Sequence, residues 1–349
     1  APPAEGGGGG GETRYSPGIE VEINDHRFRC DSILGRGSYS EVWRADVLAG
    51  APTDGVSEVA LKEVRCGSQA ELQQAIFEVQ VLLALERSTP SDPQDAAGAA
   101  QAQTELRVPR CISYKVEPCA GGAGWKVRTA MTVVPGESLD LFIRRPLPPS
   151  WSRTRAIRHG CGLATKLIRD MAPMLRLLSP IAWHRDVNSH NILIDDPDAL
   201  LGSPSSPTAS STASHAAGER PGGAQAAPAA SAGGVGPEES RATFWLIDFG
   251  LAVDSQSWVT ERGKWRTEYI GGDSRYWPPS SWIMHLFGPE GFAGREDLCE
   301  QYQRRLDIHG LGITAFELLC TVALAARPPP SPARSAGAGG APGEASDAG

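Results

Sequence analysis

The sequence predicts an α+β fold in which a strand-rich part comes before a mainly helical part. Short apolar and β-branched runs, separated by glycine-rich or polar turns, lie between residues 27 and 134. Helical periodicity dominates from Leu139 to Leu178, and an apolar helical segment follows at Leu311–Ala326. Runs of strands followed by runs of helices are typical of α+β proteins.

The composition argues against two classes of partner and indicates a compartment. The chain has 349 residues, enough for one large domain or two medium ones, and a formal net charge of −8. It therefore lacks the basic surplus expected of a protein that binds nucleic acid or an anionic membrane. Its seven cysteines form no CxxC pair and no cysteine–histidine cluster at zinc spacing. We expect free thiols in a reducing compartment, the cytoplasm or the nucleus.

Several segments are too poor in apolar residues to join a packed core. We expect disorder in residues 1–18, in an insertion at 196–241 and in a tail at 328–349, and a loop insertion at 88–104. The insertion at 196–241 separates two apolar runs, NILI and TFWLI, so it can lengthen the turn of a hairpin at little entropic cost. Because the chain has no initiator Met and no signal or lipidation motif, we expect a fragment or a processed chain.

The most apolar stretch of the chain is Leu311–Ala326. It is shorter than a bilayer span and contains Glu317. We therefore expect a buried helix here and no transmembrane segment.

The first strand-like runs flank a glycine-rich turn at residues 35–40. Gly35, Gly37 and Ser38 fit a GxGxx turn, and Val42 follows soon after. Glycines in such a turn let the backbone approach phosphates, toward which successive N–H groups point. The alternative is an ordinary turn between the two strands of a hairpin.

A lysine and a glutamate in the next two elements are expected to form an ion pair. Val59, Ala60 and Leu61 form an apolar run that ends in Lys62. Residues 69–86 form an amphipathic helix, and Glu78 lies within its apolar face. An unpaired carboxylate would avoid that face, whereas a lysine at a strand end is by default solvated. A Lys62–Glu78 pair explains both positions.

Two more strands are expected at Val108–Val116 and Lys126–Val134, followed by a turn at 135–138. The helical signal that follows carries many arginines. We expect them on a solvated face, because long charged side chains usually are exposed; they are Arg144, Arg145, Arg153, Arg155, Arg158, Arg169 and Arg176.

The stretch around which the chain is organised is WHRDVNSHNILI, at residues 183–194. Asp186 is followed five residues later by Asn191, on a loop that runs into an apolar strand. This spacing is typical of a phosphoryl-transfer loop: the aspartate accepts or orients the proton of an attacking hydroxyl, and the asparagine reaches a magnesium ion. The alternative is an aspartate that caps a helix.

A second acidic motif, Asp248-Phe249-Gly250, comes directly after the strand-like TFWLI. The default interpretation is a turn. As a functional residue, Asp248 would hold the metal ion that bridges the phosphates.

The order of these motifs resembles that of the eukaryotic protein kinase family. Glycine loop, VALK, helix glutamate, HRDxxxxN, DFG and DIHGLG follow one another between Phe28 and Cys320. The resemblance implies a two-lobed fold, with a small antiparallel β lobe carrying one helix (19–134) and a mainly helical large lobe (135–327) truncated after its central helix. It also implies ATP and Mg²⁺ as cofactors.

The resemblance assigns roles to individual residues. Lys62 would contact the phosphates and pair with Glu78, Asp186 would be the catalytic base, and Asn191 and Asp248 would hold Mg²⁺. The remaining expected roles are adenine contacts (Val42, Ala60 and Leu193), the back of the pocket (Met131), the interlobe hinge (Thr132, Val133 and Val134), a hydrophobic stack (Leu82, His184 and Phe249) and an anchor for the catalytic loop (Asp307).

The chain departs from the family pattern in several places. Ser40 replaces the third loop glycine. Asn188 stands where serine/threonine kinases have Lys, and Asp273 stands where they have Thr. We expect these two changes to be linked by a hydrogen bond from the Asn188 amide to the Asp273 carboxylate. Ser280 replaces a glutamate whose ion pair is then missing.

The leading expectation is an active protein kinase that phosphorylates Ser or Thr of a protein, because the tyrosine-kinase signature is absent from the catalytic loop. The main alternative is a pseudokinase that binds ATP or partners without efficient turnover. A small-molecule kinase is a third class. A phosphate on Thr260 or Thr267 is expected to pair with Arg185 and order the segment after Gly250. The substrate and the oligomeric state are left open.

Overall fold

The computed structural model describes most of the chain between Tyr15 and Ala325. The described residues are 15–37, 40–50, 55–88, 106–119, 122, 124–148, 150–195, 242–260, 263–268 and 270–325. The expectations for residues 1–14, 89–104, 196–241 and 328–349, and for Ser38, lie outside this part of the chain.

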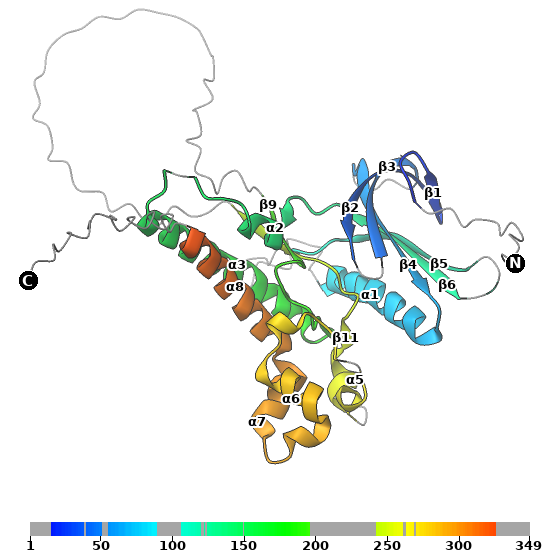
Figure 1. The fold of residues 1–349 in the computed structure, drawn as a ribbon. Coiled ribbons are helices and arrows are strands. Elements are labelled where there is room, and N and C mark those ends of the chain that lie inside the picture. The colour runs from blue at the N-terminus through cyan, green and yellow to red at the C-terminus, as the bar shows by residue number, and fades with distance from the viewer. Residues whose placement is uncertain are drawn as a thin grey trace, which may run out of the picture.

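The first part of the chain folds into a six-stranded antiparallel sheet (Figure 1). The strand order is β1-β2-β3-β4-β6-β5, so only the last two strands are out of chain order. The two strands predicted at Val108–Val116 and Lys126–Val134 are present, although β5 begins three residues later and ends two residues later than predicted, and β6 begins one residue earlier and ends two residues earlier. The strands are β1 (Glu20–Ile23), β2 (His26–Arg36), β3 (Ser40–Ala49), β4 (Glu58–Cys66), β5 (Cys111–Pro118) and β6 (Trp125–Thr132).

The predicted N-terminal disordered segment extends too far along the chain. Tyr15 is buried against the sheet, in a cluster that includes Phe28 and Trp43. The backbone N–H of Gly18 donates to the carbonyl of Cys30 at 2.7 Å. Residues 15–18 therefore belong to the folded part, and the expectation of disorder is wrong for them.

Helix α1 (Gln69–Ser88) packs on one side of this sheet (Figure 1). Its start follows from the sequence Ser68-Gln-Ala-Glu71, a capping-box pattern. The Ser68 hydroxyl accepts the Glu71 N–H at 3.2 Å, and the Glu71 carboxylate accepts the Gly67 N–H at 2.8 Å. Leu72 and Val79 on its apolar face pack with strand residues, as predicted from the helical periodicity.

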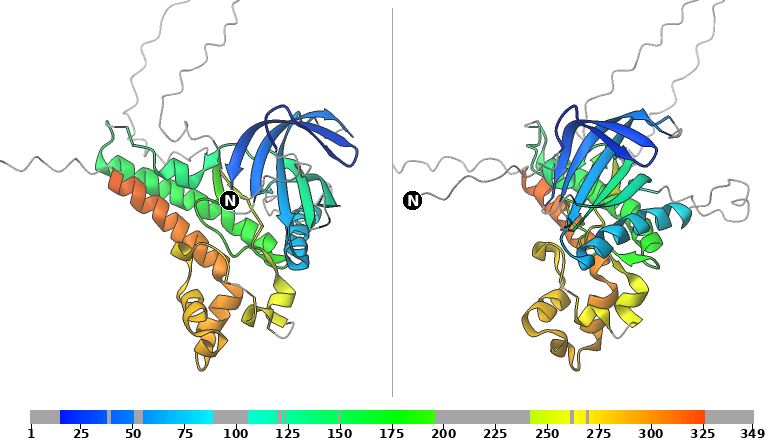
Figure 2. Two further views of the ribbon diagram at one scale, coloured as in Figure 1. Left: turned by 45° about the vertical axis from the view of Figure 1, so that its right-hand side comes forward. Right: turned by 90° about the vertical axis from the view of Figure 1, so that its right-hand side faces the viewer.

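The second part of the chain is mainly helical. Helices α3 (Arg153–Leu178) and α8 (Leu306–Ala325) lie side by side (Figures 1 and 2). Gly160 allows this approach, because a Cβ at that position would lie 3.3 Å from Val322. All seven arginines that were expected on a solvated face are exposed. The other helices are α2 (Leu139–Ile143), α5 (Ser255–Thr260), α6 (Pro279–Phe287) and α7 (Glu296–Arg304), with 3₁₀ turns η2 (Lys264–Arg266), η3 (Ser274–Tyr276) and η4 (Pro289–Phe292).

Short paired strands flank the HRD and DFG sequences in the second part of the chain. The runs NILI and TFWLI pair as predicted: β9 (Ile192–Asp195) is antiparallel to β10 (Thr243–Leu246). Strand β7 (Glu137–Ser138) adds to β9, and β8 (Ala182–Trp183) pairs with β11 (Val253–Asp254). These pairs fix the two segments that carry the HRD and DFG sequences.

Helix α8 is the one described helix whose length and apolar composition would also suit a membrane span. In the folded chain its buried face packs along α3 and contributes Leu311, Leu318 and Val322 to the largest core cluster. Its opposite face leaves Ile308 and Phe316 exposed. The helix begins five residues before the predicted apolar segment.

Candidate functional site

The backbone of the HRD loop is hydrogen-bonded to the start of α8. The buried carboxylate of Asp307 accepts the backbone N–H of His184 at 2.8 Å and that of Arg185 at 2.7 Å. Gly310, one turn later, lies so close to the loop that a Cβ would be 2.5 Å from the carbonyl oxygen of Val187. The predicted role of Asp307 as an anchor of this loop is confirmed.

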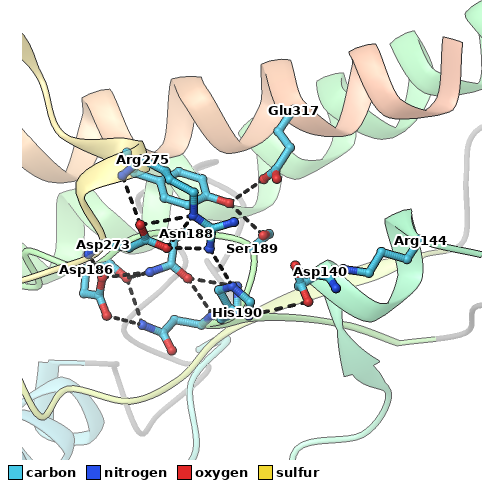
Figure 3. Close-up of polar contacts among 11 residues, drawn as sticks. Asp140, Arg144, Asp186, Asn188, Ser189, His190, Asp273, Arg275 and Glu317 are labelled. Carbon is cyan, nitrogen blue, oxygen red and sulfur yellow. Dashed lines mark hydrogen bonds and ion pairs between the residues drawn. The ribbon is translucent and has the colours of Figure 1, made fainter. Parts of the chain in front are cut away.

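Three donors hold the carboxylate of Asp186 in one orientation (Figure 3). The amide nitrogens of Asn188 and Asn191 each donate at 2.7 Å, one to each carboxylate oxygen. The backbone N–H of Asp273 donates at 2.9 Å to the oxygen that also accepts from Asn188. Asp186 is therefore fixed by neutral donors from its own loop and from the segment before α6.

Asn188 also shapes the loop itself. Its side-chain oxygen accepts the backbone N–H groups of His190 at 2.8 Å and Asn191 at 3.2 Å. The Asn188 side chain is almost fully buried, so these bonds replace the hydrogen bonds to water that the two backbone N–H groups lose on folding.

The expected hydrogen bond between Asn188 and Asp273 is not made. Asn188 uses its amide on Asp186, whereas the carboxylate of Asp273 pairs with Arg275, at 2.6 Å from Nη2 (Figure 3). Burial acts to raise the pKa of Asp273, but its hydrogen bonds to Arg275 outweigh burial and hold the pKa below the usual range. Each residue finds a partner two positions away in the sequence, and those local contacts take precedence.

A network of polar residues continues from Arg275 away from Asp186 (Figure 3). Nη2 of Arg275 donates to Nε2 of His190 at 2.9 Å, since a guanidinium can only donate. Nδ1 of His190 lies 3.6 Å from a carboxylate oxygen of Asp140 on α2, and Arg144 binds the other oxygen. This network links α2 to the segment that contacts Asp186.

The predicted Lys62–Glu78 ion pair is present, and Asp248 joins it. Nζ of Lys62 lies 2.6 Å from Glu78 on α1 and 2.8 Å from Asp248 of the DFG motif. Desolvation acts to lower the pKa of Lys62, but the two carboxylates outweigh it and raise the pKa above its usual value. Burial acts to raise the pKa of Asp248, and Lys62 reverses this, so the pKa of Asp248 is lowered.

Asp248 and Asn191 each keep one oxygen that could ligate a metal ion. One carboxylate oxygen of Asp248 accepts from Lys62 and from the Gly250 N–H at 3.3 Å. The second makes no hydrogen bond with the described residues, and the side chain is 47% exposed. The amide oxygen of Asn191 is likewise without such a bond. Mg²⁺ is usually held by one or two protein oxygens together with phosphates, so these residues fit the ion. The described residues contain no cluster of three His, Cys, Asp or Glu side chains that would hold a metal on its own.

The three residues of the expected hydrophobic stack are all buried. Leu82 and Phe249 share one core cluster, and the rings of His184 and Phe249 are 5.0 Å apart. Nε2 of His184 donates to the carbonyl of Ile247 at 3.2 Å, since a carbonyl can only accept. The stack therefore connects α1, the HRD loop and the DFG segment.

The residues expected around the adenine lie on neighbouring strands. Gly35 lies near the end of β2, where it is paired with Val42 on β3, and Gly37 lies between these two strands. Ala60 on β4 is paired with Met131 on β6, and both side chains are buried. Three further positions are half-buried: Leu193 on β9, and Val133 and Val134, which follow the end of β6 at Thr132. The glycine turn is a strand connection, as both interpretations of the sequence required.

Gln74 is a site residue that the sequence reasoning missed. Its Nε2 donates to the carbonyl oxygen of Gly250, the last residue of the DFG motif, at 3.0 Å and to that of Ala252 at 2.7 Å. A signal was present, because Gln74 lies one helical turn before Glu78 and therefore on the same face of α1.

These contacts define a class of fold. An antiparallel sheet with one helix, a lysine shared between a helix glutamate and a DFG aspartate, and an HRD loop anchored on a central helix together form a divergent protein-kinase-like fold.

Solved structures to which the chain is similar include kinase domains. The chain is similar to vaccinia related kinase 3, with 13% identity and a TM-score of 0.45 over 88% of this chain and 69% of that one. It is also similar to the BubR1 kinase domain, with 15% identity and a TM-score of 0.42 over 91% of this chain and 88% of that one. No protein-family model and no curated protein matches the chain. Because these likenesses are low, the chain's own contacts carry the functional argument.

Proposed function

We propose that the chain is a protein kinase that uses ATP and Mg²⁺ to phosphorylate a Ser or Thr hydroxyl of a protein. The observation that carries this proposal is the contact of Lys62 with both Glu78 and Asp248, at 2.6 and 2.8 Å. A lysine that was merely solvated would not be buried between two carboxylates from elements 16 and 186 residues away in the chain. The arrangement suits a cation poised beside phosphate groups and a metal ion.

Each polar residue has a distinct task in this reaction. ATP and Mg²⁺ supply the phosphoryl group and the neutralisation of its charge. Lys62 binds phosphate oxygens, and Glu78 keeps its ammonium group in position. Asn191 and Asp248 hold the metal ion through the oxygens described above. Asp186 orients the substrate hydroxyl and accepts its proton, because its carboxylate is fixed by the three donors named above.

One observation favours a second function, that of a pseudokinase. Within the described residues, the donors that bind the Asp186 carboxylate are all neutral, because Asn188 stands where a lysine is expected. A cation near the transferred group lowers the barrier by stabilising developing charge. We therefore propose slow turnover, and ATP binding without transfer is the alternative outcome.

Phosphoamino-acid analysis after incubation with γ-labelled ATP, Mg²⁺ and a peptide mixture tests the proposal. We expect label on phosphoserine or phosphothreonine. Binding of ATP without label would select the pseudokinase, and label on phosphotyrosine would overturn the Ser/Thr assignment. Label on a metabolite in place of peptide would select a small-molecule kinase. The Lys62→Met variant is the negative control, because it removes the phosphate contact, and Lys115→Met, on the edge strand β5, is its matched control.

An intracellular location, the cytoplasm or the nucleus, is part of the proposal. All seven cysteines are free, which suits a reducing compartment. Fractionation of cells that express the tagged full-length protein tests the location, and recovery from the secreted fraction would overturn it.

A further inference from the structure

Three consecutive backbone carbonyls, beginning with that of the DFG glycine, are each bound by a side chain. Gln74 donates to Gly250 O and Ala252 O at 3.0 and 2.7 Å. Nε of Arg185 donates to Leu251 O, between them, at 2.8 Å. We call this arrangement, in which Gln74 and Arg185 bind the carbonyls of residues 250–252, the carbonyl clamp.

The two halves of the clamp come from opposite sides of the site. Gln74 lies on α1, one turn before Glu78, so a single helix face holds both Lys62 and residues 250–252. Arg185 belongs to the HRD loop, whose backbone is fixed by Asp307. Gly250 and Leu251 lie in a turn that is closed by a hydrogen bond from the Ala252 N–H to the Phe249 carbonyl at 2.9 Å, and side chains of two separate elements bind the three carbonyls that follow.

The guanidinium of Arg185 is enclosed by the helical part of the chain. It lies over the ring of Trp258 on α5, 5.1 Å from the centroid, which is the geometry of a cation–π contact. Trp258 packs against Tyr302, and Trp265 and Phe292 complete this buried aromatic cluster. Desolvation lowers the pKa of Arg185, and nearby acidic groups, Glu268 and Asp307 among them, act against that effect.

The two threonines that were expected to be phosphorylated are directed elsewhere. Thr260 donates its hydroxyl to the carbonyl of Gln256, and Thr267 donates to that of Lys264, at 3.3 Å. Both side chains are exposed. Arg185 already has a carbonyl and an aromatic face as partners, so an ordered segment does not require a phosphate on either threonine.

We propose that the carbonyl clamp, supported by the stacking of Arg185 on Trp258, holds the segment after the DFG motif in its ordered conformation without phosphorylation of Thr260 or Thr267. Its consequence for activity rests on the proposed function: transfer would then be constitutive with respect to these two sites. The clamp also couples α1 to the HRD loop, because a side chain from each of these elements binds carbonyls of residues 250–252.

Hydrogen exchange of the full chain tests this proposal without depending on transfer. The amides of residues 250–257 are followed by mass spectrometry, in the unchanged chain both before and after phosphatase treatment. Val253 and Asp254 pair with β8, so these amides should be slow to exchange in the native arrangement. Four proteins are compared: the unchanged chain, Thr260→Ala/Thr267→Ala, Gln74→Glu and Gln73→Glu.

The Gln74→Glu change keeps the size of the side chain but replaces the amide group, which donates to two carbonyls, with a carboxylate, which can only accept. Gln74 is half-buried, so the change leaves the core intact, and Gln73 is its exposed neighbour. We expect at least tenfold faster exchange in Gln74→Glu. The dephosphorylated chain, the double threonine variant and Gln73→Glu should agree within twofold.

Several outcomes would overturn the proposal. Loss of protection in the dephosphorylated chain or in the double threonine variant would mean that phosphate orders the segment. Unchanged exchange in Gln74→Glu would mean that the clamp does not hold it. Transfer is measured on the same samples. Expected exchange without any transfer would leave the clamp supported and would refute the kinase activity, so the two failures are distinguishable.

Discussion

Replacing Lys62 by Met should destabilise the fold by about 3 kcal/mol at pH 7. Lys62 and Glu78 are 7% and 8% exposed, so the change leaves a carboxylate buried without its partner. Breaking a buried ion pair in this way costs about 3–5 kcal/mol. The cost has an upper limit, because the carboxylate can take up a proton: at about 1.36 kcal/mol per pH unit, neutralising an ordinary glutamate at pH 7 costs about 3.7 kcal/mol.

The penalty should shrink as the pH falls, for two reasons. A buried, unpaired Glu78 is less costly where protonation is easier, so the variant gains relative to the unchanged protein below pH 7. The lowered pKa of Asp248 adds stability to the unchanged protein above the ordinary aspartate pKa of 3.8, and this is lost as the pH falls through the folded-state pKa. The raised pKa of Lys62 extends the pair's contribution on the alkaline side, where it is lost only as the pH rises through that pKa.

Urea denaturation followed by tryptophan fluorescence measures this difference. A second substitution, Lys62→Met/Glu78→Leu, should recover stability to within about 1 kcal/mol of the unchanged protein, because replacing both partners of a buried pair by apolar groups is often nearly neutral. Lys115→Met removes a partly exposed pair with Glu117 and should cost less than about 1 kcal/mol. A loss below about 1 kcal/mol in Lys62→Met, or no recovery in the double variant, would refute the reasoning.

Two further substitutions test the support of the HRD loop. Gly310→Ala places a Cβ 2.5 Å from the carbonyl oxygen of Val187, so it should destabilise the protein by about 1–3 kcal/mol in thermal unfolding. Gly312→Ala, which has open space around it, should stabilise the same helix by about 0.5–1 kcal/mol, and a change of the same sign in both variants would contradict the close approach of Gly310 to the loop. Asn188→Ala leaves two loop amides without their acceptor and releases one oxygen of Asp186, so it should cost about 1–3 kcal/mol by urea denaturation, and a loss below 0.5 kcal/mol would show that the loop holds itself.

Contacts that follow from an element's own pattern could be predicted from the sequence. Glu78 stands on an apolar helix face, which requires a buried partner, and Lys62 was the available cation. The runs NILI and TFWLI are short, apolar and separated by a low-complexity stretch, which indicated their pairing. The anchoring role of Asp307 came from the resemblance, since a single aspartate before a helix has no distinctive pattern.

Contacts that depend on competition between partners could not be predicted. The Asn188–Asp273 hydrogen bond was wrong because both residues have nearer partners within two positions along the chain, and residue types alone do not rank them. Gln74 binds backbone carbonyls, which every residue has, so the sequence does not indicate which carbonyls it binds. Tyr15 was assigned to a disordered segment because the glycines around it dominate the local composition, although a single aromatic side chain suffices to fix the chain to the sheet.

Kinase activity is tested most directly by transfer of the γ-phosphate from labelled ATP with Mg²⁺, compared between the unchanged chain and Asp186→Asn. Asp46→Asn, an aspartate in an exposed ion pair with Arg29, is the matched control. If the chain is a kinase, incorporation should fall at least about 100-fold in Asp186→Asn and be unchanged in the control. Equal incorporation in Asp186→Asn, or none in the unchanged chain while ATP still raises its melting temperature, would contradict it.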